Sequence, residues 1–182
     1  YVFKRFHLPE EKFKLLRVYP IISKSGLFYN YSKKDIQKIR DQNLNLLIRA
    51  GTGILKGDIL NVCPNGVVSF HHGDNDLYRG GPPGFWEVFH SNPRTGFIIQ
   101  RLNEELDGGD VLYKGFISTG WFYSLNLAKL YEISNPFFHK VLEKITSESY
   151  LPLDKVKIPY CDRIYKLPTF LQSFNYLIKT FK

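Results

Sequence analysis

The sequence contains no methionine, and its 182 residues include only 2 cysteines. Cys63 and Cys161 lie far apart and form no Cys-x-x-Cys pair, so the chain has neither a disulfide framework nor the ligand spacing of a structural zinc site. Lone cysteines are compatible with a reducing compartment, and we expect a cytoplasmic protein. The first residue is Tyr1, so the missing initiator methionine indicates a processed chain or a fragment.

Long uncharged stretches are absent as well. No run approaches the roughly 20 apolar residues that a membrane-spanning helix needs, and no N-terminal stretch has the organisation of a signal peptide. The chain is instead rich in aromatic residues, with 15 Phe and 12 Tyr, which argues against disorder. Its length suits one folded domain with a smaller appendage.

The charge is unevenly distributed. Residues 1–45 carry 10 basic and 4 acidic side chains, residues 46–118 carry 6 and 8, and residues 119–182 carry 9 and 5. The two basic ends favour an anionic partner such as tRNA, a nucleotide-linked sugar or a membrane surface, because lysine and arginine raise the local concentration of any polyanion. An ordinary solvated basic surface is the alternative reading.

Hydrophobic patterning predicts an α/β fold. Runs rich in β-branched and aromatic residues predict strands at 14–22, 44–49, 67–70, 96–102 and 110–118. Helical spacing predicts helices at 32–42, at 57–60, just after Pro83, at 124–145 and from Thr169. Ser32, with a carboxylate three residues later, has the pattern of a helix N-cap. Because Asn135-Pro136 interrupts the 124–145 pattern, we expect two helical pieces there.

The chemistry-bearing residues gather between 66 and 110. His71 ends the predicted strand 67–70 and leads into a glycine- and aspartate-rich turn. Asp107 precedes Gly108-Gly109, which allow a tight turn and the close approach of a ligand. A histidine and a carboxylate brought together in this way can carry general acid–base chemistry. Arg79 contacts an anionic substrate or braces its turn, and the sequence does not decide between these roles.

A metal site is the alternative for the same tract. His71 and His72, with Asp74 and Asp76, are residue types that bind divalent ions. Adjacent residues on a strand point to opposite faces, however, so the two histidines are poorly placed to share one ion. We therefore expect no metal and assign His72 a supporting role.

Four blocks in order resemble the folate-dependent formyltransferases: the run from Leu44 to Leu55, Ser-x-His at 69–71, Arg79-Gly80, and Glu-Leu-Asp-Gly-Gly at 105–109. That family includes methionyl-tRNA, glycinamide ribonucleotide and sugar-amine formyltransferases. The resemblance extends from Leu44 to about Phe116. It implies a formyltransferase-like, Rossmann-like α/β sheet flanked by helices.

The resemblance also implies a domain organisation. Residues 1–118 would form the formyltransferase-like α/β domain, and residues 119–182 a mainly helical, basic C-terminal extension. Members of the family usually carry a longer nucleotide-fold-like half before the strand that begins here near Leu44. The N-terminal part of the domain is therefore expected to be incomplete.

The catalytic set of the family is an asparagine, a histidine and an aspartate. By resemblance the last two map onto His71 and Asp107, while Ser69 occupies the position of the asparagine. The asparagine amide donates to the oxygen of the tetrahedral intermediate, and loss of one such donor typically costs about 10²–10³ in rate. Ser69 is thus expected to be a weaker oxyanion donor, with His71 either handling the amine proton or polarising the formyl oxygen, and Asp107 orienting the imidazole.

The donor implied by the resemblance is 10-formyltetrahydrofolate. Its binding site would comprise Thr52, Gly53, Ile54 and Leu55, completed by Glu105 and Leu106. Gly53 leaves main-chain groups accessible, and the apolar side chains that follow it supply a wall for a flat heterocycle.

The expected function is transfer of a formyl group to a primary amine of a small substrate, with an amino sugar, free or nucleotide-linked, as the first expectation. The alternative is a weak or inactive formyltransferase-like module that binds folate or another ligand. A tRNA formyltransferase would add a strand-rich C-terminal barrel, whereas the last 60 residues read mostly helical, so we expect no nucleic-acid partner.

Overall fold

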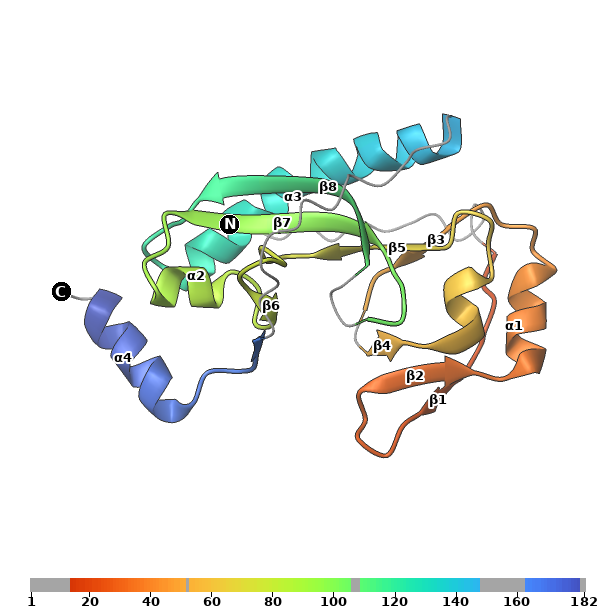
Figure 1. Ribbon diagram of the computed structural model, residues 1–182, viewed down its shortest axis with the longest axis horizontal. Coiled ribbons are helices and arrows are strands. Elements are labelled where there is room, and N and C mark those ends of the chain that lie inside the picture. The colour runs from red at the N-terminus through yellow and green to blue at the C-terminus, as the bar shows by residue number, and fades with distance from the viewer. Residues whose placement is uncertain (1–13, 52, 106–108, 148–162, 181–182) are drawn as a thin grey trace.

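A four-stranded sheet forms the centre of the protein, whose structure is a computed structural model that describes residues 14–51, 53–105, 109–147 and 163–180 (Figure 1). Its strands are β3 (Leu47–Arg49), β5 (Val67–His71), β7 (Arg94–Arg101) and β8 (Asp110–Ser118), in that spatial order. β3 runs parallel to β5, whereas β7 is antiparallel to both of its neighbours, β5 and β8. The strands predicted from the sequence at these positions are confirmed, with ends that differ by at most three residues.

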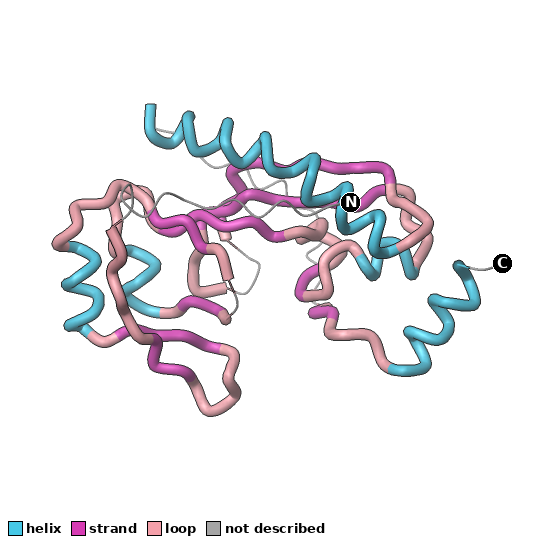
Figure 2. Tube along the Cα trace, turned by 180° about the vertical axis from the view of Figure 1, so that it is seen from behind, coloured by secondary structure: helices cyan, strands magenta, loops and turns pink. Residues whose placement is uncertain are grey.

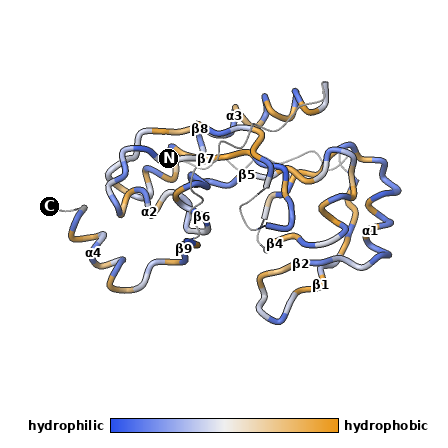
Figure 3. The backbone as a smooth tube through the Cα atoms, viewed as in Figure 1, coloured by the Kyte–Doolittle hydropathy of each residue, from blue (hydrophilic) through white to orange (hydrophobic). Residues whose placement is uncertain are grey.

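β7 is buried almost along its whole length, as expected for a strand covered on both faces. Its residues alternate between the faces. Phe97 and Ile99 point to one face, and Ile98 and Gln100 to the other. Figure 3 shows apolar residues along β7 and β8.

The long helix α3 (Tyr123–Ser147) covers the first of these faces (Figure 2). Two groups of buried residues join the helix to the sheet: Val68, Ile99 and Leu112 with Val141 and Ile145, and Phe97 and Ile117 with Leu130. The hydrophobic core of the sheet is therefore completed by a helix from the C-terminal third of the chain.

The prediction of two helical pieces at 124–145 is wrong, because α3 continues through Pro136. Proline has no N–H, so the carbonyl of Glu132, four residues earlier, loses its helical partner. Both Pro136 and Glu132 are exposed, so water can hydrogen-bond the freed carbonyl. Packing of the helix on the sheet on both sides of the proline outweighs the lost hydrogen bond.

A second layer of elements lies beside β3 (Figure 1). It contains β1 (Pro20–Ile22), β2 (Phe28–Tyr31), α1 (Lys33–Arg40), β4 (Ile54–Leu55) and the short 3₁₀ helix η2 (Gly57–Asn61). Its core consists of Ile36, Ile39, Ile59, Leu60, Val62 and Cys63. The Ser32 N-cap is confirmed, since its hydroxyl accepts the Asp35 N–H at 3.1 Å. The strand predicted at 14–22 is shorter than expected, and β2 and β4 were not predicted.

The remaining elements lie at the other end of the central sheet (Figure 1). They are β6 (Arg79–Gly80), α2 (Phe85–Phe89), β9 (Ile164–Tyr165) and α4 (Phe170–Thr180). α2 begins after Gly84, so Pro83 precedes the helix instead of occupying its first turn. Phe85 and Trp86 of α2 are buried. Among the helices of the described residues, none combines the length and the apolar run required to cross a bilayer.

Candidate functional site

Register places three polar side chains side by side on the face of the sheet opposite α3. Arg49 of β3 pairs with Ser69 of β5, and Ser69 pairs with Gln100 of β7. Paired residues on neighbouring strands share a face, with Cβ atoms about 5 Å apart. We call Arg49, Ser69 and Gln100 the polar row. His71 lies two residues beyond Ser69 and therefore points to the same face.

A small cavity of about 70 Å³ adjoins the polar row. Arg49 and Gln100 line it, and so do four residues predicted for the donor site: Gly53, Ile54, Leu55 and Glu105. Thr52 and Leu106, which complete the predicted donor site, lie outside the described residues. The structure thus brings together the described part of the predicted donor site and adds Arg49 and Gln100, which the sequence did not indicate.

Gly53 has a backbone that requires glycine. Its φ is +82°, and a Cβ on this residue would lie 2.7 Å from the ring of Tyr29. Its carbonyl accepts a hydrogen bond from the guanidinium of Arg49. The loop after β3 is therefore held against the polar row by a side chain of the row itself.

Ser69 is 2% exposed, and its hydroxyl is engaged by the backbone. It donates to the carbonyl of Phe70 at 3.1 Å and lies 3.5 Å from the carbonyl of Arg49. A hydroxyl has one proton, so in this arrangement it is directed at main-chain oxygen. To donate to a bound ligand, Ser69 would have to rotate.

His71 is half-buried, and its Nε2 lies 3.2 Å from the carbonyl oxygen of Tyr78. Gly73 makes this contact possible, because a Cβ there would lie 2.7 Å from the same carbonyl and 2.8 Å from the imidazole. The loop from 72 to 78 consequently folds back over the histidine. The backbone of this loop, at the Tyr78 carbonyl, therefore sets the orientation of the His71 ring.

His72 points the other way, as the strand alternation predicted. Its Nε2 lies 3.1 Å from the Ser134 hydroxyl of α3, and its ring stacks on Phe70 and meets Tyr131 edge-on. Burial, and to a lesser degree the neighbouring His71, lowers the pKa of His72 to about 4. His72 is thus a neutral packing residue at neutral pH.

The two aspartates of the same loop pair with a lysine. Lys114 of β8 places its Nζ 2.5 Å from a carboxylate oxygen of Asp74 and 2.5 Å from one of Asp76. Within the part of the chain that the structure describes, no group of three metal-ligating side chains comes together. The ammonium group of Lys114 lies between the carboxylates of Asp74 and Asp76, where a metal ion would lie under the alternative hypothesis.

Asp107 lies outside the described residues, so its predicted role stays a prediction. The described residues on either side of 106–108 both lie at the polar row. Glu105 lines the cavity, and the N–H of Gly109 donates to the Gln100 side chain at 3.2 Å. Gln100 is therefore an anchor for the chain just after this segment.

Glu87 is a buried carboxyl group that the sequence did not indicate. It is 1% exposed on α2, and its Oε1 has no hydrogen-bond partner among the described residues. Desolvation, with a smaller contribution from the nearby Asp74 carboxylate, raises the pKa of Glu87 to about 7. A glutamate between two buried aromatic stretches was the only sequence signal available.

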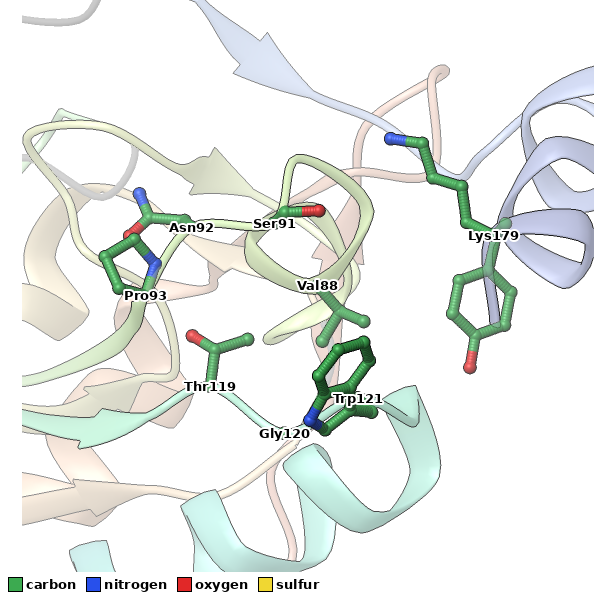
Figure 4. A pocket seen from close by; sticks show the side chains of 9 residues that line it. Val88, Ser91, Asn92, Pro93, Thr119, Gly120, Trp121 and Lys179 are labelled. Carbon is green, nitrogen blue, oxygen red and sulfur yellow. The ribbon is translucent and has the colours of Figure 1, made fainter. Parts of the chain in front are cut away.

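A larger cavity of about 380 Å³ lies at the far end of the sheet, between α2, the end of β8 and α4 (Figure 4). Trp121 and Val88 border it, and Lys179 of α4 donates to the Phe89 carbonyl at 2.9 Å beside it. Pro93 lines this cavity, and Gln100 lies six positions along β7 from the next residue, Arg94, which corresponds to about 20 Å. This cavity is therefore separate from the polar row.

Comparison with solved structures confirms the predicted fold class, a formyltransferase-like α/β fold. A sugar N-formyltransferase from a Shewanella species matches 82% of this chain and 64% of that chain, with a TM-score of 0.55 at 18% identity. Phosphoribosylglycinamide formyltransferase from Bacillus halodurans matches 64% and 61%, with a TM-score of 0.57 at 17% identity. The formyltransferase PseJ from Anoxybacillus kamchatkensis, in complex with a UDP-linked formamido sugar and tetrahydrofolate, matches 69% and 66%, with a TM-score of 0.50 at 16% identity.

Sequence comparison confirms the predicted resemblance to formyltransferases. The chain is 34% identical over 80 residues to methionyl-tRNA formyltransferase of Ruminiclostridium cellulolyticum and 24% identical over 101 residues to that of Desulforamulus reducens. The matched parts cover 43% and 56% of this chain. They span only 26% and 31% of those relatives. No family model matches the sequence.

Proposed function

We propose that this chain transfers a formyl group from 10-formyltetrahydrofolate to a primary amine of a small substrate, with an amino sugar, free or nucleotide-linked, as the acceptor. The observation that carries the proposal is the polar row beside His71 at the edge of the cavity that Gly53, Ile54 and Leu55 line. An apolar wall next to convergent polar groups suits the carbonyl-bearing end of a flat ligand, and the cavity of about 70 Å³ has room for that end alone.

In the proposed reaction the amine nitrogen attacks the formyl carbon, and the carbonyl electron pair moves to the formyl oxygen. Collapse of this oxyanion breaks the bond between the formyl carbon and the donor nitrogen. His71 would take the proton from the attacking nitrogen and return it to the leaving one, giving a formamide and tetrahydrofolate. Asp107 would orient the imidazole.

Donor binding can be tested by calorimetric titration with a stable 10-formyltetrahydrofolate analogue. Ile54→Ala removes part of the apolar wall, and we expect roughly tenfold weaker binding. Ile48→Ala is the matched control, because Ile48 is 54% exposed on β3 and does not line the cavity. Equal affinities for both variants would place the ligand elsewhere, and no saturable binding to the intact chain would refute the proposal.

Turnover can be tested with His71→Ala in a screen of small amines. We expect at least about a 10²-fold loss of rate with donor binding retained, because a positioned acid–base group typically contributes 10²–10⁴-fold. His139→Ala is the control, since its side chain is 75% exposed on α3. Undiminished turnover in His71→Ala would remove the histidine from the proposed chemistry.

The second candidate is a module that binds folate or a related ligand without turnover. The position of the Ser69 hydroxyl favours it, because that hydroxyl already donates to the backbone. Ser69→Asn separates the two candidates. A large gain in rate indicates an active but handicapped site, whereas donor binding with continued absence of turnover indicates the binding module.

A further inference from the structure

Arg49 carries a buried N–H group that no acceptor among the described residues satisfies. Its Nε is fully covered and, among the described residues, has no hydrogen-bond partner, while another nitrogen of the same guanidinium donates to the Gly53 carbonyl. A guanidinium stays protonated under all ordinary conditions. Leaving a buried charged donor unpaired is costly, so such a group calls for an acceptor beyond those that the described residues supply.

The position of Arg49 indicates where that acceptor comes from. Arg49 lines the cavity that adjoins the polar row and is paired in register with Ser69. The hydroxyl of Ser69 and the side-chain oxygen of Gln100 already have main-chain partners. Arg49 therefore brings a fixed positive charge and an unpaired Nε–H to the strand next to the one that carries His71, and the side chain has to turn towards the cavity for this covered N–H to meet a ligand.

We infer that Arg49 donates its Nε–H to the formyl oxygen of the donor and stabilises the negative charge that this oxygen gains when the amine attacks. The inference rests on the proposed function and adds a catalytic residue to it. The carbonyl electron pair moves to the oxygen as the new carbon–nitrogen bond forms, and returns when the bond to the donor nitrogen breaks. A cation held by the fold acts on this oxygen mainly in the transition state, which raises kcat more than it lowers KM.

The geometry also explains how the site works with serine in the polar row. Ser69 contributes a small side chain that leaves room beside Arg49, and its proton is directed at the backbone. The charge of Arg49 substitutes for a neutral donor on the neighbouring strand. An amide introduced at position 69 would therefore partly restore a site that has lost Arg49.

The first experiment is a proton–nitrogen NMR spectrum of the arginine side chains of the intact chain, with Arg49→Lys used to assign the Nε–H signal. A stable 10-formyltetrahydrofolate analogue is added to one sample and tetrahydrofolate, which lacks the formyl group, to another. We expect the Arg49 signal to shift clearly with the formylated ligand only. Equal shifts with both ligands would mean that the arginine contacts the ring or the carboxylate tail, and would overturn the inference.

Calorimetry on the same samples separates the two proposals. Binding of both ligands without any shift of the Arg49 signal overturns the role of Arg49 and leaves the proposed function standing. Failure of the intact chain to bind either ligand overturns the proposed function and the inference with it.

The second experiment is kinetic. Release of tetrahydrofolate from 10-formyltetrahydrofolate is followed with hydroxylamine as a small surrogate amine. We expect Arg49→Gln to lower kcat by about 10²–10³ with a nearly unchanged KM for the donor. We also expect Ser69→Asn to recover part of this loss in the double variant. Arg94→Lys, an exposed cation at the far end of β7, is the control and should be unaffected. A rise in KM at constant kcat would contradict the oxyanion role.

Discussion

At the scale of single residues, the buried carboxyl group of Glu87 links stability to pH. Its pKa is raised to about 7, so the folded protein holds a proton that the unfolded chain releases above about pH 4.5. The stabilisation is full below the unfolded pKa and is lost as the pH rises through about 7. At higher pH the folded state must either carry a buried charge or open the packing around α2.

Replacing the carboxyl group with an amide of the same size tests this linkage. We expect the free energy of unfolding of the wild type to fall relative to that of Glu87→Gln between about pH 4.5 and pH 7, by roughly 3 kcal/mol in total. Urea denaturation at several pH values measures the difference. Parallel curves for the two proteins would show that Glu87 titrates normally in the folded state.

His72 produces the opposite dependence. Its pKa is lowered to about 4, so the unfolded chain takes up a proton below about pH 6.5 while the folded protein does not. The contribution of His72 is therefore present above pH 6.5 and is lost as the pH falls towards 4.

The variant His72→Phe keeps the ring packing against Phe70 and removes the titration. We expect its unfolding free energy to decline less than that of the wild type between pH 6.5 and pH 4, measured by the same urea method. A variant that loses stability on acidification as steeply as the wild type would contradict the assignment.

A residue of the candidate site could be predicted from the sequence only where the residues next to it in the chain form a recognisable local pattern. His71 and the loop from 53 to 55 stand out as a strand end and a glycine turn. Arg49 and Gln100 do not, because their importance comes from the register of three strands, and register is a property of tertiary pairing. Glu87 gave no pattern because its burial depends on tertiary packing, which brings α2 close to Asp74.

At the scale of elements, α3 shows how tertiary packing overrides a local rule. The helix contacts the sheet through Leu130 before Pro136 and through Val141 after it. The rule that proline interrupts a helix considers the helix alone. It does not include the stabilisation that α3 gains by packing on the sheet. Short strands such as β2 and β4 escaped prediction for a related reason, since two to four residues are too few to show alternation.

The proline itself can be tested. Pro136→Ala restores an N–H that can donate to the Glu132 carbonyl, and a proline in a helix interior costs about 3 kcal/mol relative to alanine. We expect a gain of about 1–3 kcal/mol in the free energy of unfolding, measured by urea denaturation. A loss of stability would instead show that the local distortion at the proline is needed for α3 to reach both groups of core residues.

At the scale of the whole molecule, the two parts proposed from the sequence, 1–118 and 119–182, share one core. Val68 and Leu112 from the first part contact Val141 from the second. The boundary proposed between residues 118 and 119 therefore separates the central sheet from the helix that shares its hydrophobic core. Removing α3 would expose one face of the central sheet to water.

A chain that ends at Ser118 tests whether the first part folds alone. We expect no cooperative thermal transition in circular dichroism, because the loss of α3 leaves Phe97, Ile99 and Ile117 without their cover. The intact chain, studied under the same conditions, is the reference. A single sharp transition in the shortened chain would show that the sheet is stabilised by the elements beside β3 alone.

The two tryptophans report on different parts of the molecule. Trp86 is 5% exposed, and its indole N–H is shared between the carbonyls of Gly81 at 3.1 Å and Lys166 at 3.2 Å. Trp121 is 86% exposed at the edge of the larger cavity. In fluorescence, a collisional quencher such as acrylamide therefore reaches Trp121 first, and the unquenched, blue-shifted emission belongs to Trp86. The protein thus contains two natural fluorescent probes that can be distinguished spectrally. Trp86 reports on the attachment of β9 to the rest of the protein, and Trp121 reports on any molecule that binds beside α4.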